Sequence, residues 1–224
     1  MHKRFQGAAA LALTAFVGLL APSAHAQEFI NLDFEQAHNV PDPSEYRNMP
    51  WDDAAPGWQH SEGDWTGSVF YGTVTLGGQM NYILIDAILR PHLLLAGDYS
   101  LGIRSGRLFE NVPSFEHGFL AQTGAIPDAT RSLRLLATGE FEAYVGGIEI
   151  EMVSLGGNAW GGDISSFAGT VNELRLVNAH DESEQLVVFD NIEFSAQAVP
   201  EPAAAALWLA GLATLTFARR RRRR

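Results

Sequence analysis

The stretch VNELRLV, residues 171–177, decides the fold class, because its polar and apolar side chains alternate with a period of two. Glu173 and Arg175 share one parity, and Leu174 and Leu176 share the other. Successive side chains of a β-strand point to opposite faces of its sheet. The stretch therefore predicts a strand whose leucines enter a core and whose charged side chains face solvent.

Short runs of the same kind extend on both sides of this stretch, and no long amphipathic helix is found in the sequence between residues 27 and 198. The runs cover residues 29–34, 69–76, 82–89, 99–104, 117–122, 133–135, 145–153, 171–177 and 186–194. Glycine, proline, asparagine and aspartate separate them, so we expect about eight or nine strands in an all-β sandwich or barrel. The one exception is residues 163–168, where Asp163 could cap a single helical turn that ends at Gly169.

Charge is distributed unevenly along the 224 residues, which hold 15 basic and 26 acidic side chains for a net charge of −11. Eight of the basic residues lie at the ends, namely Lys3, Arg4 and the arginine run 219–224. Without these and Glu201, residues 27–198 hold 7 Arg, no Lys and 25 acids, a net charge of −18. This excludes nucleic acid as a partner, since phosphate binding needs clustered Lys and Arg. Such a body should repel acidic polysaccharide unless calcium bridges the two.

Residues 1–26 have the layout of a secretory signal peptide. A positive start at Lys3 and Arg4 precedes an almost wholly apolar run over residues 8–21. Ala24-His25-Ala26 then places small residues at the −3 and −1 positions of a cleavage site. The alternative is an uncleaved anchor, but the run is shorter than the ~20 residues that span a membrane. We expect export through the Sec translocon and a mature chain of one 172-residue domain, residues 27–198, before the C-terminal tail.

The C-terminal tail, residues 199–224, mirrors this layout. Its opening motif, Val199-Pro200-Glu201-Pro202, contains two prolines, which cannot continue a strand or a helix. Residues 203–218 are uncharged, and an arginine cluster follows that begins with Arg219, Arg220 and Arg221. An apolar stretch before a positive stop predicts a transmembrane helix held by the positive-inside rule. Sixteen residues reach only ~24 Å against a hydrocarbon core of ~30 Å, which suits transient retention.

These three parts, in this order at the end of the chain, resemble the PEP-CTERM sorting signal. The resemblance implies recognition by a membrane-embedded exosortase, transient anchoring in the inner membrane and cleavage near the Pro-Glu-Pro motif. It also implies delivery to the cell surface or the extracellular matrix of a bacterium that makes exopolysaccharide. The alternative is an ordinary tail anchor.

The body, in turn, resembles jelly-roll carbohydrate-binding modules through three short motifs. Asn31-Leu32-Asp33-Phe34-Glu35 is similar to their Asn-x-x-Phe-Glu start, and Pro56-Gly57-Trp58 to the Pro-Gly-Trp that ends the following loop. Phe189-Asp190-Asn191-Ile192 is similar to their last strand. The resemblance implies a jelly-roll-like β-sandwich whose first and last strands lie near each other.

That family often holds a structural calcium ion between these two strands. The resemblance therefore implies Glu35 and Asp190 as calcium ligands, with Asn31 and Asp33 as nearby candidates. Calcium prefers hard oxygen ligands of this kind. The alternative is that Glu35 and Asp190 are solvated turn carboxylates, since the body has 25 acids.

Four aromatic side chains in glycine-rich loops are candidates for stacking on sugar rings: Tyr46, Trp51, Trp65 and Trp160. The alternative is that they cap the open ends of the sandwich, as large side chains do where loops cover a core. Trp58, inside the Pro-Gly-Trp motif, is expected in the core.

Catalytic chemistry finds little support in the sequence. Glu149 and Glu151 are two apart, as on one strand face, and a carboxylate pair ~5 Å apart serves retaining glycosidases. Sandwich glucanases, however, carry a third acid on that strand, and here Met152, Val153 and Ser154 follow. Cysteine is absent, as is any local zinc or nucleophile-elbow motif. We predict a secreted, non-enzymatic component of the polysaccharide matrix, structural or carbohydrate-binding; the alternatives are a lectin-like module with a defined glycan and a glycosidase-like enzyme.

Overall fold

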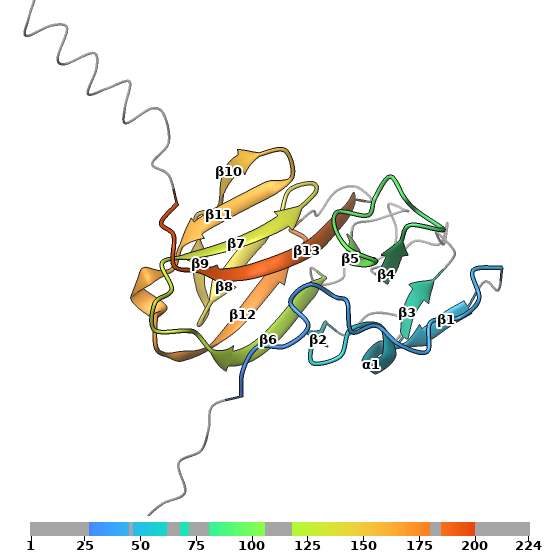
Figure 1. The fold of residues 1–224 in the computed structure, drawn as a ribbon, viewed down its shortest axis with the longest axis horizontal. Helices are drawn as coiled ribbons and strands as arrows, with labels where there is room; N and C mark the ends of the chain where they lie inside the picture. Colours follow the sequence, from blue (N-terminus) through green and yellow to red (C-terminus); the bar gives the residue numbers. More distant parts are fainter. Residues whose placement is uncertain are drawn as a thin grey trace, which may run out of the picture.

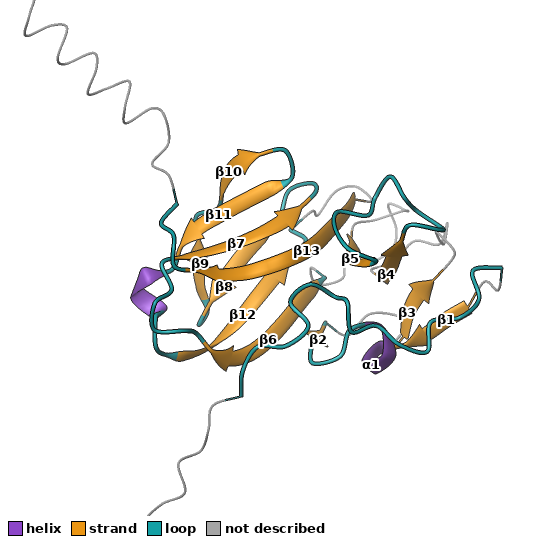
Figure 2. Cartoon of the chain, viewed as in Figure 1, coloured by secondary structure: helices purple, strands orange, loops and turns teal. Residues whose placement is uncertain are grey.

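A computed structural model of the 224-residue chain describes residues 27–44, 47–61, 68–71, 81–105, 118–179 and 185–199. These residues form two β-sheets, which Figure 1 shows as separate layers, with β6, β12 and β8 behind β7 and β13. The only helical pieces among them are two short turns, so Figure 2 shows a fold made of strands and loops. The all-β, sandwich-like class predicted from the alternation is confirmed.

The larger sheet has eight strands in the order β1-β3-β4-β5-β13-β7-β11-β10. All neighbours pair antiparallel except β3 and β4, which are parallel. The strands of this sheet are β1 (Arg47–Pro50), β3 (Ser68–Tyr71), β4 (Asn81–Asp86), β5 (Tyr99–Ser105), β13 (Gln185–Ser195), β7 (Ser132–Ala137), β11 (Ala159–Asp163) and β10 (Val153–Gly156).

The smaller sheet has five antiparallel strands in the order β2-β6-β12-β8-β9. Its strands are β2 (Gln59–His60), β6 (Phe119–Ala125), β12 (Val171–Val177), β8 (Glu142–Val145) and β9 (Ile148–Ile150). The VNELRLV stretch is β12, and its Leu174 and Leu176 are fully buried, as the alternation predicts.

The core lies between the sheets and takes side chains from both. Trp58 is buried, as expected, and its indole Nε1 donates to the Asn31 carbonyl at 2.9 Å. Trp51, in the one-turn helix α1 (Trp51–Ala54), joins the same cluster. The expected helical turn is a 3₁₀ turn, η1 (Ser165–Phe167). Asp163 Oδ1 accepts its first N–H, from Ser165 at 2.9 Å, and Gly169 follows the turn with φ +72°.

The described residues contain thirteen strands, more than the eight or nine expected. Much of the excess comes from the run 145–153, which is not one strand. Gly146 and Gly147 adopt φ +58° and +77°, a region that glycine enters without steric cost, and they turn the chain from β8 into β9. Gly156 and Gly157 make the matching turn between β10 and β11.

Residues 29–34 are not the strand that was expected. Asn31 and Phe34 have positive φ angles of 51° and 56°, and the Phe34 N–H donates to the Asn31 carbonyl in a turn. An isolated bridge joins Glu28, just before this segment, to Ala125 at the end of β6. The first segment therefore meets β13 as a turn, with the Ile192 N–H donating to the Leu32 carbonyl at 2.9 Å.

Several predicted features lie outside the described residues: the signal peptide 1–26, the sorting tail from Pro200 to the arginine cluster, Tyr46 and Trp65. Within the described part of the chain, no helix is long and apolar enough to cross a membrane. The division into residues 1–26, 27–198 and 199–224 stays a prediction.

Candidate functional site

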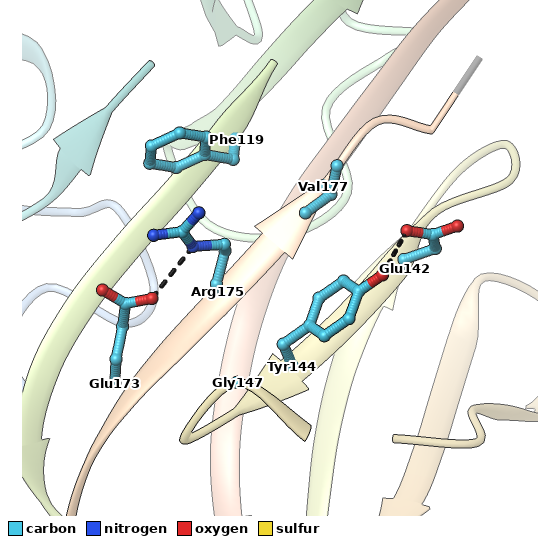
Figure 3. A pocket seen from close by; sticks show the side chains of 7 residues that line it. All are labelled: Phe119, Glu142, Tyr144, Gly147, Glu173, Arg175 and Val177. Atoms are coloured by element: carbon cyan, nitrogen blue, oxygen red, sulfur yellow. Dashed lines mark hydrogen bonds and ion pairs between the residues drawn. The ribbon is translucent and has the colours of Figure 1, made fainter. Parts of the chain in front are cut away.

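The candidate site is a pocket of about 610 Å³ on the outward face of the five-stranded sheet. Figure 3 shows aromatic, acidic and basic side chains around it, standing on β6, β12 and β8. Its lining residues are Phe119, Glu142, Tyr144, Gly147, Glu173, Arg175 and Val177.

The strand register assembles this pocket from three separate segments. Arg175 on β12 lies opposite Tyr144 on β8, and Val177 lies opposite both Glu142 and Phe119. Directly opposed residues of antiparallel strands have Cβ atoms about 4.5–5.5 Å apart, so these side chains are neighbours on one face. Because the alternate residues of β12 are core leucines, the charged parity has to face outward.

The guanidinium of Arg175 is held between an acid and a ring. Its Nε lies 2.9 Å from Glu173 Oε1, and its Cζ lies 4.2 Å from the centroid of the Phe119 ring. A cation over an aromatic face is attracted by the ring quadrupole, and a planar guanidinium also stacks on it. Arg175 therefore has a fixed position in the pocket although it is only half-buried.

Tyr144 is fixed in a similar way on the other side of the pocket. Its hydroxyl donates to Glu142 Oε2 at 2.6 Å. That hydrogen bond, burial and the charges of Glu142 and Glu149 raise the pKa of Tyr144 to about 12. The hydrogen bond to Glu142 thus restrains the position of the phenol in the pocket.

The lining of this pocket combines two kinds of side chain. Two aromatic rings offer apolar faces, and the carboxylates and the guanidinium offer acceptors and donors at the rim. Hydrogen-bonded charged side chains in fixed positions give orientation and specificity to a pocket of this size. A sugar presents both a flat C–H face and a ring of hydroxyl groups, and these two kinds of surface match the two kinds of side chain.

The structure places the two described candidates for sugar stacking in the core or at its rim. Trp51 is 6% exposed, donates from Nε1 to the Trp58 carbonyl at 2.5 Å and packs against Tyr82 with centroids 4.9 Å apart. This burial contradicts the prediction that Trp51 stacks on a ligand. Trp160 is half-buried, donates to the Ala137 carbonyl at 3.2 Å and packs edge-on against Phe141. Trp160 lies on strand β11 and not in a loop, and sugar stacking by this partly exposed ring stays a prediction.

The carboxylate pair Glu149 and Glu151 does not share a strand face, because β9 ends at Ile150. Glu149 lies opposite Tyr144 in the β8–β9 pairing, while Glu151 follows the strand end. Both side chains are exposed. The geometric premise for a catalytic pair is therefore wrong.

A second polar site joins the first segment of the body to β13, as the resemblance to carbohydrate-binding modules implies. Asp190 is 1% exposed and accepts from Ser100 Oγ at 2.6 Å, from the Ala96 N–H at 3.0 Å and from the Asn191 N–H at 2.6 Å. Glu35 Oε1 accepts from the N–H groups of Asp98 and Tyr99 at 2.8 and 3.1 Å. Both carboxylates thus accept hydrogen bonds from the same segment, residues 95–100, which leads into β5.

The two carboxylates also interact electrostatically. Burial, with a further contribution from the charge of Glu35, raises the pKa of Asp190 to about 6 against three hydrogen bonds that lower it. Two nearby carboxylates, one of them buried, form a site of negative charge, and a bound cation would neutralise that charge.

The predicted ligands do not complete the coordination shell of a calcium ion at this place. Asn31 is buried, but its Oδ1 accepts the Gln36 N–H at 3.0 Å; Asp33 is exposed and accepts the Glu35 N–H at 3.4 Å. Among the residues that the structure describes, no group of three or more His, Cys, Asp or Glu side chains is placed to hold a metal ion. Calcium takes six to eight oxygens, so Glu35 and Asp190 would need backbone carbonyls and water beside them.

Comparison with known proteins identifies the tail. Residues 198–223 match the PEP-CTERM protein-sorting motif. The described residues are thus all-β, and the tail matches a sorting signal of exported, cell-surface proteins, which implies processing by an exosortase. No curated protein matches the chain.

Among solved structures, the chain is similar to the crystal structure of CBM27-1 from Caldicellulosiruptor saccharolyticus in complex with mannohexaose. The identity is 12% and the TM-score 0.34, with 69% of this chain and 99% of that chain covered.

Proposed function

We propose that the protein is a non-enzymatic component of the bacterial cell surface or extracellular matrix that associates with polysaccharide. The Sec translocon exports it, the inner membrane holds it transiently, and exosortase processing delivers it. The PEP-CTERM match supports the sorting steps. The jelly-roll topology of the sandwich is part of this proposal.

The pocket on the five-stranded sheet is the observation that carries the polysaccharide role. Phe119 and Tyr144 stand there with three charged side chains whose positions are fixed by contacts of 2.6–4.2 Å. A preformed site of this kind binds a hydroxyl-rich ligand with little ordering cost, since its side chains are already restrained.

A glycan array with the exported, processed protein tests the binding role. We expect retention of neutral glycans by the wild-type protein, and the variant Tyr144→Ala should lose it. The matched control is Tyr99→Phe, which keeps an aromatic ring on the other sheet and should bind as the wild type does. No binding to any glycan at millimolar concentration would remove the lectin-like role and leave a structural one.

A reducing-sugar assay on the same glycans tests the absence of catalysis. We expect no release of reducing ends over a day of incubation. Hydrolysis that survives in Glu149→Gln and Glu151→Gln but is lost in Glu142→Gln or Glu173→Gln would show that the pocket is an active site.

We further propose a structural calcium ion at Glu35 and Asp190. Its support is the local excess of negative charge around a buried carboxylate and the position of both acids between the start of the body and β13. Calcium there would neutralise the pair and hold the loop of residues 95–100 against it.

A further inference from the structure

The last described residues do not leave the fold at the end of β13 but remain in contact with β7 and β11 of the eight-stranded sheet. The Arg131 N–H donates to the Ser195 carbonyl at 2.7 Å. Ser132 Oγ donates to the Gln197 carbonyl at 2.7 Å, and Arg134 Nη2 donates to the Ala198 carbonyl at 3.2 Å. We call residues 197–199 the stem, and its backbone is docked on β7.

The contacts beneath the stem combine a buried serine with a partly exposed arginine. Ser132 is fully buried, and Arg134 Nε donates to its Oγ at 3.3 Å, so the two stem-binding side chains support each other. On the neighbouring strand β11, a Cβ added at Gly161 would lie 3.4 Å from Val199 Cγ2 and 3.0 Å from Leu155 Cδ1. Glycine at this position therefore leaves the space that Val199 and Leu155 fill.

The docked stem overlaps the sorting signal. The match to the PEP-CTERM motif begins at residue 198, so Ala198 and Val199 belong both to the signal and to the docked segment. Only residues 200–202 separate Val199 from the uncharged stretch that starts at Ala203. Four Cα steps of a fully extended chain reach at most ~14 Å. While the stem is docked and the tail lies in the membrane, almost no undocked chain is therefore accessible to a membrane-embedded protease on the N-terminal side of the motif.

We propose that the sandwich restrains its own sorting signal, and that exosortase acts on the state in which the stem has left Ser132, Arg134 and Gly161. Enzymes and receptors that take extended peptides bind their backbone groups, and the Gln197 and Ala198 carbonyls are occupied in the docked state. The apparent rate then scales with the fraction of molecules that are undocked. This inference rests on the sorting role proposed above.

Pulse-chase labelling of the full-length chain, in cells that contain the exosortase, tests the restraint by the rate of conversion from precursor to processed form. Arg134→Ala removes one exposed hydrogen bond to the stem, which should raise the rate about two- to fivefold. Gly161→Val, which displaces Val199, should raise it as well. The control is Arg131→Ala, which removes the same charge from the same edge but keeps the backbone N–H that binds Ser195, and it should leave the rate unchanged.

Melting of the purified variants confirms that the sandwich is folded in each. If the wild-type chain is processed but both Arg134→Ala and Gly161→Val are processed at the same rate or more slowly, the restraint is overturned and the sorting role stands. A wild-type chain that is never processed would overturn both the restraint and the sorting role.

Discussion

Arg175 joins the polar and the aromatic side of the candidate pocket, since it contacts Glu173 and Phe119 at once. Both contacts use the planar guanidinium, which donates from Nε to the carboxylate and places its flat face over the ring. A lysine has the same charge but neither feature. The pocket thus depends on the shape of this side chain as much as on its charge.

At the same scale, burial of Trp51 makes a prediction about stability. We expect Trp51→Ala to lower the free energy of unfolding by about 3–5 kcal/mol, because it leaves a cavity and removes the donor to the Trp58 carbonyl. Urea unfolding of the exported protein measures the change. Ile88→Ala, at a side chain that is 72% exposed, should stay within about 0.5 kcal/mol. A loss below about 1 kcal/mol for Trp51→Ala would contradict its place in the core.

Gly97 carries a second prediction for a single residue. It has φ +55°, and a Cβ at this position would collide with the Glu35 carboxylate that accepts from Asp98 and Tyr99. Gly97→Ala should therefore destabilise the protein by about 1–3 kcal/mol, through the strained backbone and the displaced carboxylate. Gly157→Ala is the matched control, since it also has a positive φ, of 59°, but open space around it. Similar losses in both variants would show that the carboxylate contact contributes nothing.

At the scale of the element, β12 shows how alternation fixes the position of a strand. Leu176→Ala should cost about 2–5 kcal/mol, because it empties a fully buried position between the sheets. Val171→Ala on the opposite parity, where the side chain is 53% exposed, should change the unfolding free energy by less than about 0.5 kcal/mol. Equal effects, measured by thermal or urea unfolding, would mean that the strand does not present one face to the core.

The same strand shows how far sequence reasoning reaches. The parity of Glu173 and Arg175 was visible in the sequence, and so was their exposure. Their partners Phe119 and Tyr144 were not, because register depends on which strands pair, and a period of two carries no information on that. The period-two pattern of the run 145–153 predicts one strand because odd and even positions keep their character across Gly146 and Gly147, although the backbone reverses there.

Other errors came from residues whose backbone depends on distant contacts. Asn31 and Phe34 adopt positive φ angles in a turn whose neighbours are Trp58 and Ile192, far along the chain. Trp51 looked like a ligand contact since loops lie on the surface, but its side chain lies in the core between the sheets. Tertiary packing decided both cases, and local pattern could not reveal it.

At the scale of the whole molecule, the dominant feature is the negative net charge of the body. Residues 27–198 carry −18, and two acids, Glu35 and Asp190, lie together where the first segment meets the last strand. A cation bound at this place would stabilise the folded chain, since an ion that binds only the native state shifts unfolding by mass action.

Melting with calcium and with a chelator tests that site. We expect a higher Tm in calcium; an ion at 100 times its Kd adds about 2.7 kcal/mol. Asp190→Asn should remove this dependence. Asp163→Asn, which changes an acid at the far 3₁₀ turn, should retain it. An identical Tm with calcium and with chelator in the wild-type protein would show that the proposed calcium site does not exist.

The central claim is that the exported sandwich binds polysaccharide through the outward face of its five-stranded sheet. Its most direct test is equilibrium binding of the processed protein to the polysaccharide of the producing bacterium, for the wild type, Tyr144→Ala, Arg175→Ala and the control Arg131→Ala. We predict saturable binding by the wild type and the control, and at least a tenfold loss, about 1.4 kcal/mol, in both pocket variants. Equal binding by all four proteins would contradict the claim.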